Sequence, residues 1–402
     1  MSKITKLINN PKLFFIDALK KRKKPAQKKK PAQIFLTDNV NLLEPFTHLL
    51  HSGEGENGIN HLNLWIPLFL ESNVKFLVIT RHLETYKNVK IQYPLLDVVF
   101  AKGRNEIKHI FDKLVFLQAC FYPSNNGINI HPLEYNNIKH IFIGHGDSDK
   151  LTSAHKRFRV YDENWVAGDA HIDRFKNARF DCSGLKQVKV GRPNLIDFIK
   201  ISEINWRIRF NNEINLLYLS TWEGSSEAQN YSSVHLAIEI FEEIFRLNYI
   251  DNYAYKLHPA LGIRSQEKKS INYKLSNAFE DKNINILEYT KNDLLSDFIN
   301  KYNIFICDIS AVVSECLSLD APIFVYIPID KEIKLSQSNM RFEDYTYTFS
   351  SSNELIEKLQ KILNGNDYLK NNREKAMEYI LGKSHIEKQS FINNIKKIRY
   401  DV

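Results

Sequence analysis

Ile304-Phe305-Ile306-Cys307-Asp308-Ile309-Ser310-Ala311 predicts a buried β-strand that ends at polar residues and leads into a helix. A helix that begins directly after a strand points free backbone N–H groups outward, where an anion can bind. Aspartate and serine at such a junction are also common helix N-caps. The segment therefore predicts a strand–helix unit with either an anion site or a cap at its junction.

Two further strand ends carry histidines. Ile141-Phe142-Ile143 precedes the segment Gly144-His145-Gly146-Asp147-Ser148-Asp149-Lys150, and a third strand-like run ends at Lys256-Leu257-His258-Pro259. A histidine between glycines is expected to be exposed, because glycine lets the backbone turn sharply. One anion cradle and two strand-end histidines predict chemistry on a phosphate. Taken singly, each segment is also explained by a turn, and His131-Pro132 shows that a His-Pro pair occurs by chance.

Strand-like and helical patterns alternate twice along the chain. The predicted strands of the first half are 34–36, 74–80, 96–100, 138–143 and 188–190, and a helix is predicted over 105–114. After a polar stretch at 201–212, strands are predicted over 216–219, 253–257, 284–287, 304–307 and 323–327. The helix 234–247 places three aliphatic residues on one stripe, and three helices are predicted over 353–363, 368–380 and 385–399. Two such halves predict an α/β protein with two Rossmann-like parallel-sheet domains that face a cleft.

The size and composition agree with this organisation. A chain of 402 residues is too long for one ordinary core, and 43% hydrophobic with 25% charged residues is typical of a globular protein. No apolar run approaches the roughly 20 residues that cross a bilayer, and no secretory signal is recognised. The four cysteines show no metal-ligand spacing, which favours a reducing cytoplasm over a disulfide framework.

The net charge of +8 is concentrated at one end. Residues 1–30 hold eleven Lys or Arg and one Asp, so the rest of the chain sums to −2. This distribution argues against nucleic acid as a partner, because the fold itself is nearly neutral. Apolar residues beside a lysine cluster suit an anionic membrane surface, while a solvated tail is the alternative. The expected division is a basic amphipathic arm over 1–31, a first domain over 32–205 and a second domain over 206–402.

Candidate binding residues follow the predicted strands, because ligands of doubly wound domains collect at the carboxyl ends of the strands. These candidates are Gly146, Asp147, Ser148, Asp149, Lys150, Thr221, Trp222, Ser225, Asp308, Ser310, Ala311 and Val312. Gly168 is expected to help form the floor of the first domain's cleft. Glu315 is expected either to reach a ribose hydroxyl or to face solvent. A polar loop rich in turn formers is the alternative explanation for the 220–226 segment.

The chemical roles follow from the side chains. His145 suits a general base, because imidazole titrates near working pH, and Asp147 and Asp149 are expected to orient it or raise its basicity. Lys150 suits neutralisation of a phosphate. No carboxylate pair has metal-ligand spacing, so no metal is assigned and a Mg²⁺ requirement stays open. No serine or cysteine nucleophile elbow occurs.

Taken together and in order, these segments resemble the CDP-glycerol glycerophosphotransferase family, which builds teichoic-acid and related glycerol-phosphate capsule polymers. That family has a His-Gly-Thr-x-x-Lys loop, a Thr-Trp loop, a His-Pro pair and Asp-Tyr-Ser-Ser before a helix. The matching residues here are His145-Gly146 with Lys150, Thr221-Trp222, His258-Pro259, and Asp308 with Ser310. Asp147, Glu223 and Ala311 depart from the pattern, and the Asp-Ser-Asp-Lys variant resembles the capsule-building branch.

The resemblance implies a GT-B fold with CDP-glycerol as donor substrate and no certain cofactor. It implies that His145 and His258 are catalytic and that the start of the helix after Ser310 contacts the diphosphate. The expected acceptor is a lipid-linked glycan or a glycerol-phosphate polymer. The expected location is the cytoplasm, at the inner face of the cytoplasmic membrane, with residues 1–30 docking on the membrane or on a capsule-assembly complex. Since no region is left over to hold a long product, addition of one or a few units is favoured over polymerisation.

Two other hypotheses remain. One keeps the fold and changes the donor, giving a glycosyltransferase or sugar-phosphate transferase of capsule synthesis. The other is a non-catalytic scaffold whose basic arm attaches an assembly complex to the membrane. Donor screening distinguishes the first of these hypotheses from transfer of glycerol phosphate. The scaffold hypothesis is distinguished by its prediction that both histidines can be replaced without effect.

Overall fold

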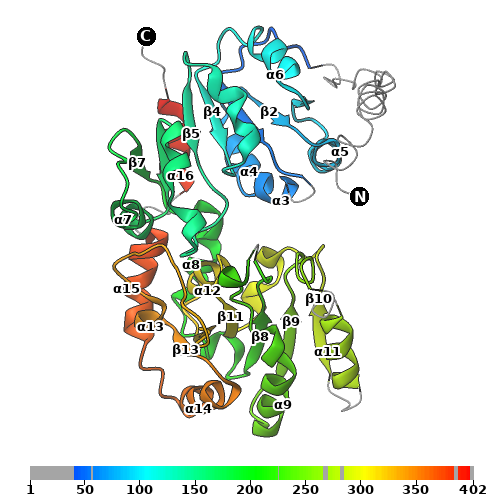
Figure 1. Cartoon of the computed structure of the whole chain (residues 1–402), viewed down its shortest axis with the longest axis vertical. Helices are drawn as coiled ribbons and strands as arrows, with labels where there is room; N and C mark the ends of the chain where they lie inside the picture. The colour runs from blue at the N-terminus through cyan, green and yellow to red at the C-terminus, as the bar shows by residue number, and fades with distance from the viewer. Residues whose placement is uncertain are drawn as a thin grey trace, which may run out of the picture.

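The computed structural model describes residues 40–55, 58–224, 226–265, 270–280, 285–383 and 388–398. The predicted arm over 1–31 and the predicted strand over 34–36 lie outside these residues. Two α/β domains lie one above the other (Figure 1), and each is built on a wholly parallel sheet. The predicted fold class, two Rossmann-like domains, is therefore confirmed.

The first domain contains a seven-stranded sheet in the order β3-β2-β1-β4-β5-β6-β7. Its strands are β1 His48–Ser52, β2 Phe76–Thr80, β3 Val98–Phe100, β4 Ala119–Tyr122, β5 Lys139–Phe142, β6 Glu163–Val166 and β7 Lys186–Lys189. Its helices are α3 Gly58–Asn63, α4 Ile66–Ser72, α5 Leu83–Gln92, α6 Arg104–Phe111 and α7 Asp169–Asn177. One hydrophobic cluster covers each face of the sheet. The strand order reverses between β1 and β4, where doubly wound domains bind ligands.

The second domain contains a six-stranded sheet in the order β10-β9-β8-β11-β12-β13. Its strands are β8 Asn215–Leu219, β9 Asn252–Lys256, β10 Ile286–Tyr289, β11 Ile304–Asp308, β12 Ile323–Tyr326 and β13 Tyr347–Phe349. Its helices are α9 Ala237–Leu247, α11 Ile271–Glu280, α12 Val312–Leu317, α13 Phe342–Tyr345, α14 Ser352–Leu363 and α15 Lys370–Leu381. The strand order reverses between β8 and β11. The two central strands β8 and β11 are buried along their whole length.

The chain crosses between the domains twice. The linker helix α8, Ile196–Ser202, packs into the core of the second domain. The last helix, α16 Lys388–Lys397, returns to the first domain, where Phe391 and Ile395 join the core against α4. Figure 1 shows α16 in red beside the upper domain. The predicted division at residue 205 assigned both helices to the other domain, because sequence order alone does not show which sheet a helix covers.

Four strands were absent from the sequence-based prediction: β1, β4, β6 and β13. Each is short, and β1 and β6 contain polar residues that the fold buries, such as His48, His51 and Glu163. Among the described residues, no helix is both long and apolar enough to span a bilayer.

Candidate functional site

The segments picked out in the sequence meet where the two domains face each other. The loop after β5 carries His145, and the loops after β8, β9 and β11 carry Thr221, His258 and Ser310. Ser314 Oγ donates to the carbonyl of Asp147 at 3.2 Å, and Lys150 Nζ donates to Thr221 Oγ1 at 3.2 Å. The His145 loop of the first domain therefore contacts two loops of the second.

Gly146 of the first domain lies against Ala311 of the second. A Cβ added at Gly146 would lie 3.1 Å from the Cβ of Ala311, a tighter separation than most real contacts of this kind. A larger residue at either position would push the two loops apart. The pairing of Gly146 with Ala311 thus sets the spacing between the His145 loop and the start of α12.

His145 has the tautomer that a general base requires. Its Nδ1 lies 2.9 Å from the carbonyl oxygen of Pro123. A carbonyl only accepts, so Nδ1 carries the proton and Nε2 presents a lone pair. The side chain is exposed, and desolvation by the surrounding protein lowers the pKa of His145 below its usual 6.5. The ring is therefore neutral and able to accept a proton at physiological pH.

A second histidine, His61 of α3, stacks on His145. The ring centroids lie 3.7 Å apart, with an angle of 7° between the planes, and desolvation lowers the pKa of His61 to about 3. One turn further, Trp65 Nε1 donates to the carbonyl of Gly144 at 2.7 Å. Residues 61 and 65 thus fix both the ring and the backbone of the His145 loop. The sequence analysis missed His61, because nothing in the sequence distinguishes it from a surface histidine.

Asp147 and Asp149 do not orient His145, which corrects one of the two expectations; against the larger lowering by desolvation, Asp147 does act to raise the pKa of His145. Asp147 is fully buried and accepts from Arg192 Nε at 2.6 Å, with His171 Nδ1 at 3.3 Å. Asp149 forms an ion pair with Arg174 at 2.7 Å. Desolvation would raise the pKa of Asp147, but Arg192 and the neighbouring cations hold it well below its usual range. Both carboxylates therefore stabilise the His145 loop through their ion pairs with arginines. The carbonyl of Pro123 orients the His145 imidazole.

His258 has the opposite tautomer to His145. Its Nδ1 accepts from the backbone N–H of Ala260 at 3.0 Å, so the proton of the neutral ring is on Nε2. Desolvation, with Lys150 and Lys256 nearby, lowers the pKa of His258 to about 4. The Trp222 ring lies parallel at 6.3 Å between centroids. His258 is therefore a neutral hydrogen-bond donor at physiological pH.

Glu223 holds the backbone that follows His258. Its carboxylate accepts from the N–H groups of Gly262 at 3.0 Å, Arg264 at 2.9 Å and Ser265 at 3.2 Å. Desolvation opposes ionisation, but these hydrogen bonds lower the pKa of Glu223. An arginine at this position, as in the resembled pattern, would offer no acceptor to these groups. The glutamate is thus matched to the turn that carries His258.

Asp308 is a positioning residue rather than a surface contact. It is fully buried, and its two oxygens accept from Thr221 N at 2.7 Å and Ser233 N at 2.9 Å. Desolvation raises the pKa of Asp308 to about 6. These hydrogen bonds join the ends of β8 and β11 at the point where the strand order reverses. The predicted contact of Asp308 with a ligand is replaced by support of the Thr221 loop.

The start of α12 lies at the same strand end. Ser310, Ala311 and Val312 are half-buried, and Ser310 Oγ donates to the carbonyl of Asp308 at 3.2 Å. Glu315 is half-buried too, and desolvation raises its pKa to about 7. Ser148 and Trp222 are also half-buried at the interface. Glu315 therefore does not simply face solvent, which was one of its two expected placements.

Two predicted binding residues are not placed in the site. Gly168 caps α7, and a Cβ added there would lie 2.4 Å from the carbonyl oxygen of Tyr379 in α15. It is a close-packing glycine between the domains, with no surface for a ligand. Ser225 lies outside the described residues. In the described ranges, no group of three or more His, Cys, Asp or Glu side chains could hold a metal ion.

A pocket of about 540 Å³ is lined by residues of both domains. Asn60, next to His61 in sequence, lines it from the first domain, and Pro259 and Ala260, which follow His258, line it from the second. Its lining residues are Ile59, Asn60, Glu84, Asn88, Pro259, Ala260, Ile263, Lys291 and Asn292. His258 itself lines a smaller pocket of about 200 Å³ with Leu257 and Tyr289.

No protein-family model and no curated protein sequence matches the chain. Solved structures match over most of its length. The wall teichoic acid polymerase TagF, soaked with CDPG, is 11% identical over 90% of both chains, with a TM-score of 0.56. HepE of Anabaena in complex with UDP is 10% identical over 87% of this chain and 100% of its own, with a TM-score of 0.54. A putative UDP-N-acetylglucosamine 2-epimerase of Listeria monocytogenes is 11% identical over 88% and 96%, with a TM-score of 0.57.

At such identities the likeness concerns architecture. The shared feature is the arrangement of two α/β domains, each built here on a parallel sheet. The chain has the two-domain GT-B fold.

Proposed function

We propose that this protein transfers glycerol phosphate from CDP-glycerol to a hydroxyl of a lipid-linked glycan or growing polymer, releasing CMP. The observation that carries the proposal is the complementary pair of imidazoles. His145 presents an unprotonated Nε2, and His258 presents an Nε2–H, from facing domains. A phosphoryl transfer needs one group that accepts the nucleophile's proton and one that stabilises charge on the phosphorus oxygens.

The reaction follows from these roles. The acceptor hydroxyl attacks the β-phosphorus of CDP-glycerol and passes its proton to His145 Nε2. The new oxygen–phosphorus bond forms as the bond from the β-phosphorus to the bridging oxygen breaks, and CMP leaves with that oxygen. His258 Nε2–H stabilises the phosphoryl oxygens, and Lys150 compensates their charge. The backbone at 310–312 is assigned to the diphosphate, as the resemblance implies.

Lys150 is suited to its role by its surroundings. Its Nζ reaches Thr221 Oγ1 across the cleft, and Asp308 lies near enough to raise its pKa in part. Desolvation nevertheless lowers the pKa of Lys150, so the ammonium gains from an anionic ligand. The present hydrogen-bond partner of Lys150 is the neutral hydroxyl of Thr221 and not a carboxylate. A diphosphate that binds Lys150 therefore has only a hydroxyl to replace.

A second candidate function is glycosyl transfer from a nucleotide sugar. HepE in complex with UDP and glucose matches this chain with a TM-score of 0.55, close to the value for TagF. In that case the attacked atom is the anomeric carbon and a nucleoside diphosphate leaves. The leaving nucleotide therefore separates the two candidates.

The test is release of nucleotide by the purified protein. CDP-glycerol, CDP-ribitol and sugar nucleotides are each offered with a short lipid-linked glycan, and CMP, UMP and UDP are measured. We expect CMP with CDP-glycerol only, and we expect His145→Ala to abolish it while CDP-glycerol still binds in calorimetry. UDP release would favour the second candidate, and loss of CDP-glycerol binding in a folded His145→Ala protein would contradict the general-base role.

The number of units added and the membrane association belong to the same proposal. Product length by mass spectrometry distinguishes one or a few additions from polymerisation. Residues 1–30, which lie outside the described residues, are assigned to docking on anionic lipid or on an assembly complex. Flotation with anionic vesicles, compared with neutral ones, distinguishes lipid from protein as the partner.

A further inference from the structure

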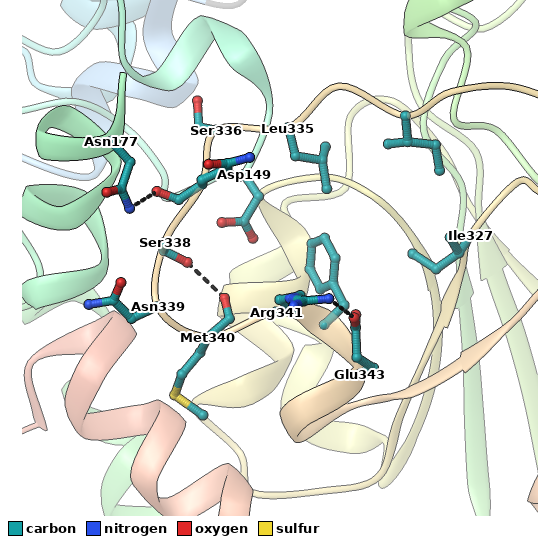
Figure 2. Close-up of a pocket in the computed structure, with 13 residues that line it drawn as sticks. Asp149, Asn177, Ile327, Leu335, Ser336, Ser338, Asn339, Met340, Arg341 and Glu343 are labelled. Atoms are coloured by element: carbon teal, nitrogen blue, oxygen red, sulfur yellow. Dashed lines mark hydrogen bonds and ion pairs between the residues drawn. The ribbon is translucent and has the colours of Figure 1, made fainter. Parts of the chain in front are cut away.

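A pocket of about 610 Å³ lies against the loop that carries His145, and it shares no lining residue with the pocket of about 540 Å³ between the domains. Most of its wall is the segment 327–343, which leaves the end of β12 and enters α13. Asp149 and Asn177 of the first domain close it (Figure 2). The lining residues are Asp149, Asn177, Ile327, Ile333, Leu335, Ser336, Gln337, Ser338, Asn339, Met340, Arg341, Phe342 and Glu343.

The pocket is preformed, because its wall is hydrogen-bonded to both domains. Ser336 N donates to the carbonyl of Asp149 at 2.7 Å, and Ser336 Oγ donates to that of Lys150 at 3.0 Å. Asn177 Nδ2 donates to the carbonyl of Gln337 at 2.9 Å, and Asn339 Nδ2 donates to Asp173 at 2.7 Å. The pocket therefore shares a wall with the loop that carries His145 and Lys150.

The charges of the pocket are already paired. Asp149 binds Arg174 at 2.7 Å, and Arg341 binds Glu343 at 3.3 Å. These two pairs include every charged residue that lines the pocket, so a phosphate or diphosphate would find no unpaired cation there. The pocket is thus unsuited to the nucleotide end of a donor.

The rest of the lining combines amides and hydroxyls with an apolar side. Asn177, Gln337 and Asn339 carry amides, and Ser336 and Ser338 carry hydroxyls. The apolar side is formed by Ile327, Ile333, Leu335, Met340 and Phe342. A sugar has the matching character, because its hydroxyls both donate and accept while its C–H faces pack on apolar side chains.

We propose that this pocket binds a neutral sugar unit of the acceptor glycan, away from the hydroxyl that reacts. The inference rests on the proposed transferase function, and it adds a carbohydrate subsite on the far side of the His145 loop. Filling the pocket stabilises the contact between the segment 335–336 and the backbone of residues 149–150. Glycan recognition is thereby linked to the placement of Lys150.

The direct test needs no donor and no turnover. Neutral sugars (glucose, galactose, N-acetylglucosamine and their disaccharides) are titrated at millimolar concentration into the full chain and followed by saturation-transfer NMR. We expect at least one to bind, and Gln337→Trp, which fills the pocket from an exposed position, to weaken binding about 10-fold or more. The matched control is Ile329→Trp, which adds the same ring on the same segment at a residue that is 83% exposed and does not line the pocket.

Met340→Trp fills the pocket from its other side and serves as the second variant should Gln337→Trp fold poorly. No binding by any neutral sugar, or binding that survives both tryptophans, would overturn the proposal. In turnover assays, Gln337→Trp should raise the KM for a long acceptor and leave the KM for CDP-glycerol unchanged. If CDP-glycerol proves not to be the donor, the sugar titration still decides whether the subsite exists.

Discussion

The imidazoles of His61 and His145 lie face to face, 3.7 Å between centroids, although His61 belongs to helix α3 and His145 to the loop after β5. His61 has a pKa of about 3 and is therefore neutral at working pH, so the stack places a flat, uncharged surface on one face of the proposed base. His145 is held at its edge by the Pro123 carbonyl and on its face by His61. This arrangement leaves Nε2 as the reactive edge.

His61→Ala should lower kcat about 10-fold or more with little change in the KM for CDP-glycerol, because the base loses its orientation. Loss of the stacked ring would also remove part of the desolvation that lowers the pKa of His145, so this pKa should rise toward 6.5 and the acid limb of the rate profile should move to higher pH. His61→Phe keeps a flat ring and should restore both kcat and the limb. If His61→Ala and His61→Phe lost kcat equally and the acid limb of the rate profile did not shift, His61 would only support the fold.

His258→Ala should lower kcat about 100-fold, as expected for loss of a donor that stabilises transition-state charge. His258→Gln retains an N–H near the position of Nε2 and should lose less. Since the pKa of His258 is about 4, its titration should leave no limb in the rate profile between pH 5 and 9. Initial rates of CMP release across this range check both statements, and a second limb removed by His258→Gln would contradict the neutral-donor role.

Asp147→Asn should destabilise the protein by about 3 kcal/mol, because Arg192 and Arg174 would lose a fully buried carboxylate. The carboxylate's pKa is depressed, so its contribution is present above about pH 4 and is lost on further acidification. Urea unfolding at pH 7 measures the change. Glu84→Gln removes an exposed pair with Lys87 and should cost about 0.5 kcal/mol or less; a similar small cost for Asp147→Asn would refute the buried network.

Glu315→Gln should raise the melting temperature at pH 8 and leave it nearly unchanged at pH 5. The pKa of Glu315 is raised from 4.5 to about 7, so the folded state favours the neutral acid, and stability from this group is lost as pH rises through 7. Glutamine imitates the neutral form. Thermal scans at the two pH values test this, with the exposed Glu332→Gln as control. A pH-independent effect would show that ionisation of Glu315 is not the cause.

Phe391→Ala should destabilise the first domain by about 3 kcal/mol, because its ring is fully buried and stacks on Trp65 at 5.0 Å. Hydrogen exchange by mass spectrometry should show faster exchange in β1–β4 and no change in β8–β12. Leu95→Ala, at a residue that is 99% exposed, is the control. Faster exchange confined to the second domain would contradict the assignment of α16.

The fold could be predicted because its central strands are almost wholly apolar. β8, β11 and β12 are continuous hydrophobic runs, which is typical of parallel strands buried on both faces. β6 could not be predicted in this way. Its Glu163 is buried because Trp165 Nε1 donates to it at 2.8 Å and Lys186 pairs with it at 3.0 Å. Such partners are visible only once the neighbouring strand is in place.

Site residues could be predicted where they directly follow a strand. They could not be predicted where their role depends on contacts with residues that are distant in sequence. His145 and His258 follow strands, and this position together with the order of the motifs made them candidates, while their catalytic roles stay predictions from the resemblance. The role of Asp147 could not be predicted, since Arg192 is 45 residues away in sequence. His61 and the pocket under 327–343 depend likewise on contacts between distant segments.

The return of α16 to the first domain has a consequence for folding during synthesis on the ribosome. Trp65, which donates to Gly144 beside the proposed base, rests against Phe391, a residue synthesised more than 300 positions later. The first domain therefore lacks part of its core until the second domain has been synthesised, and the hydrogen bond from Trp65 to the His145 loop gains its full packing support only then.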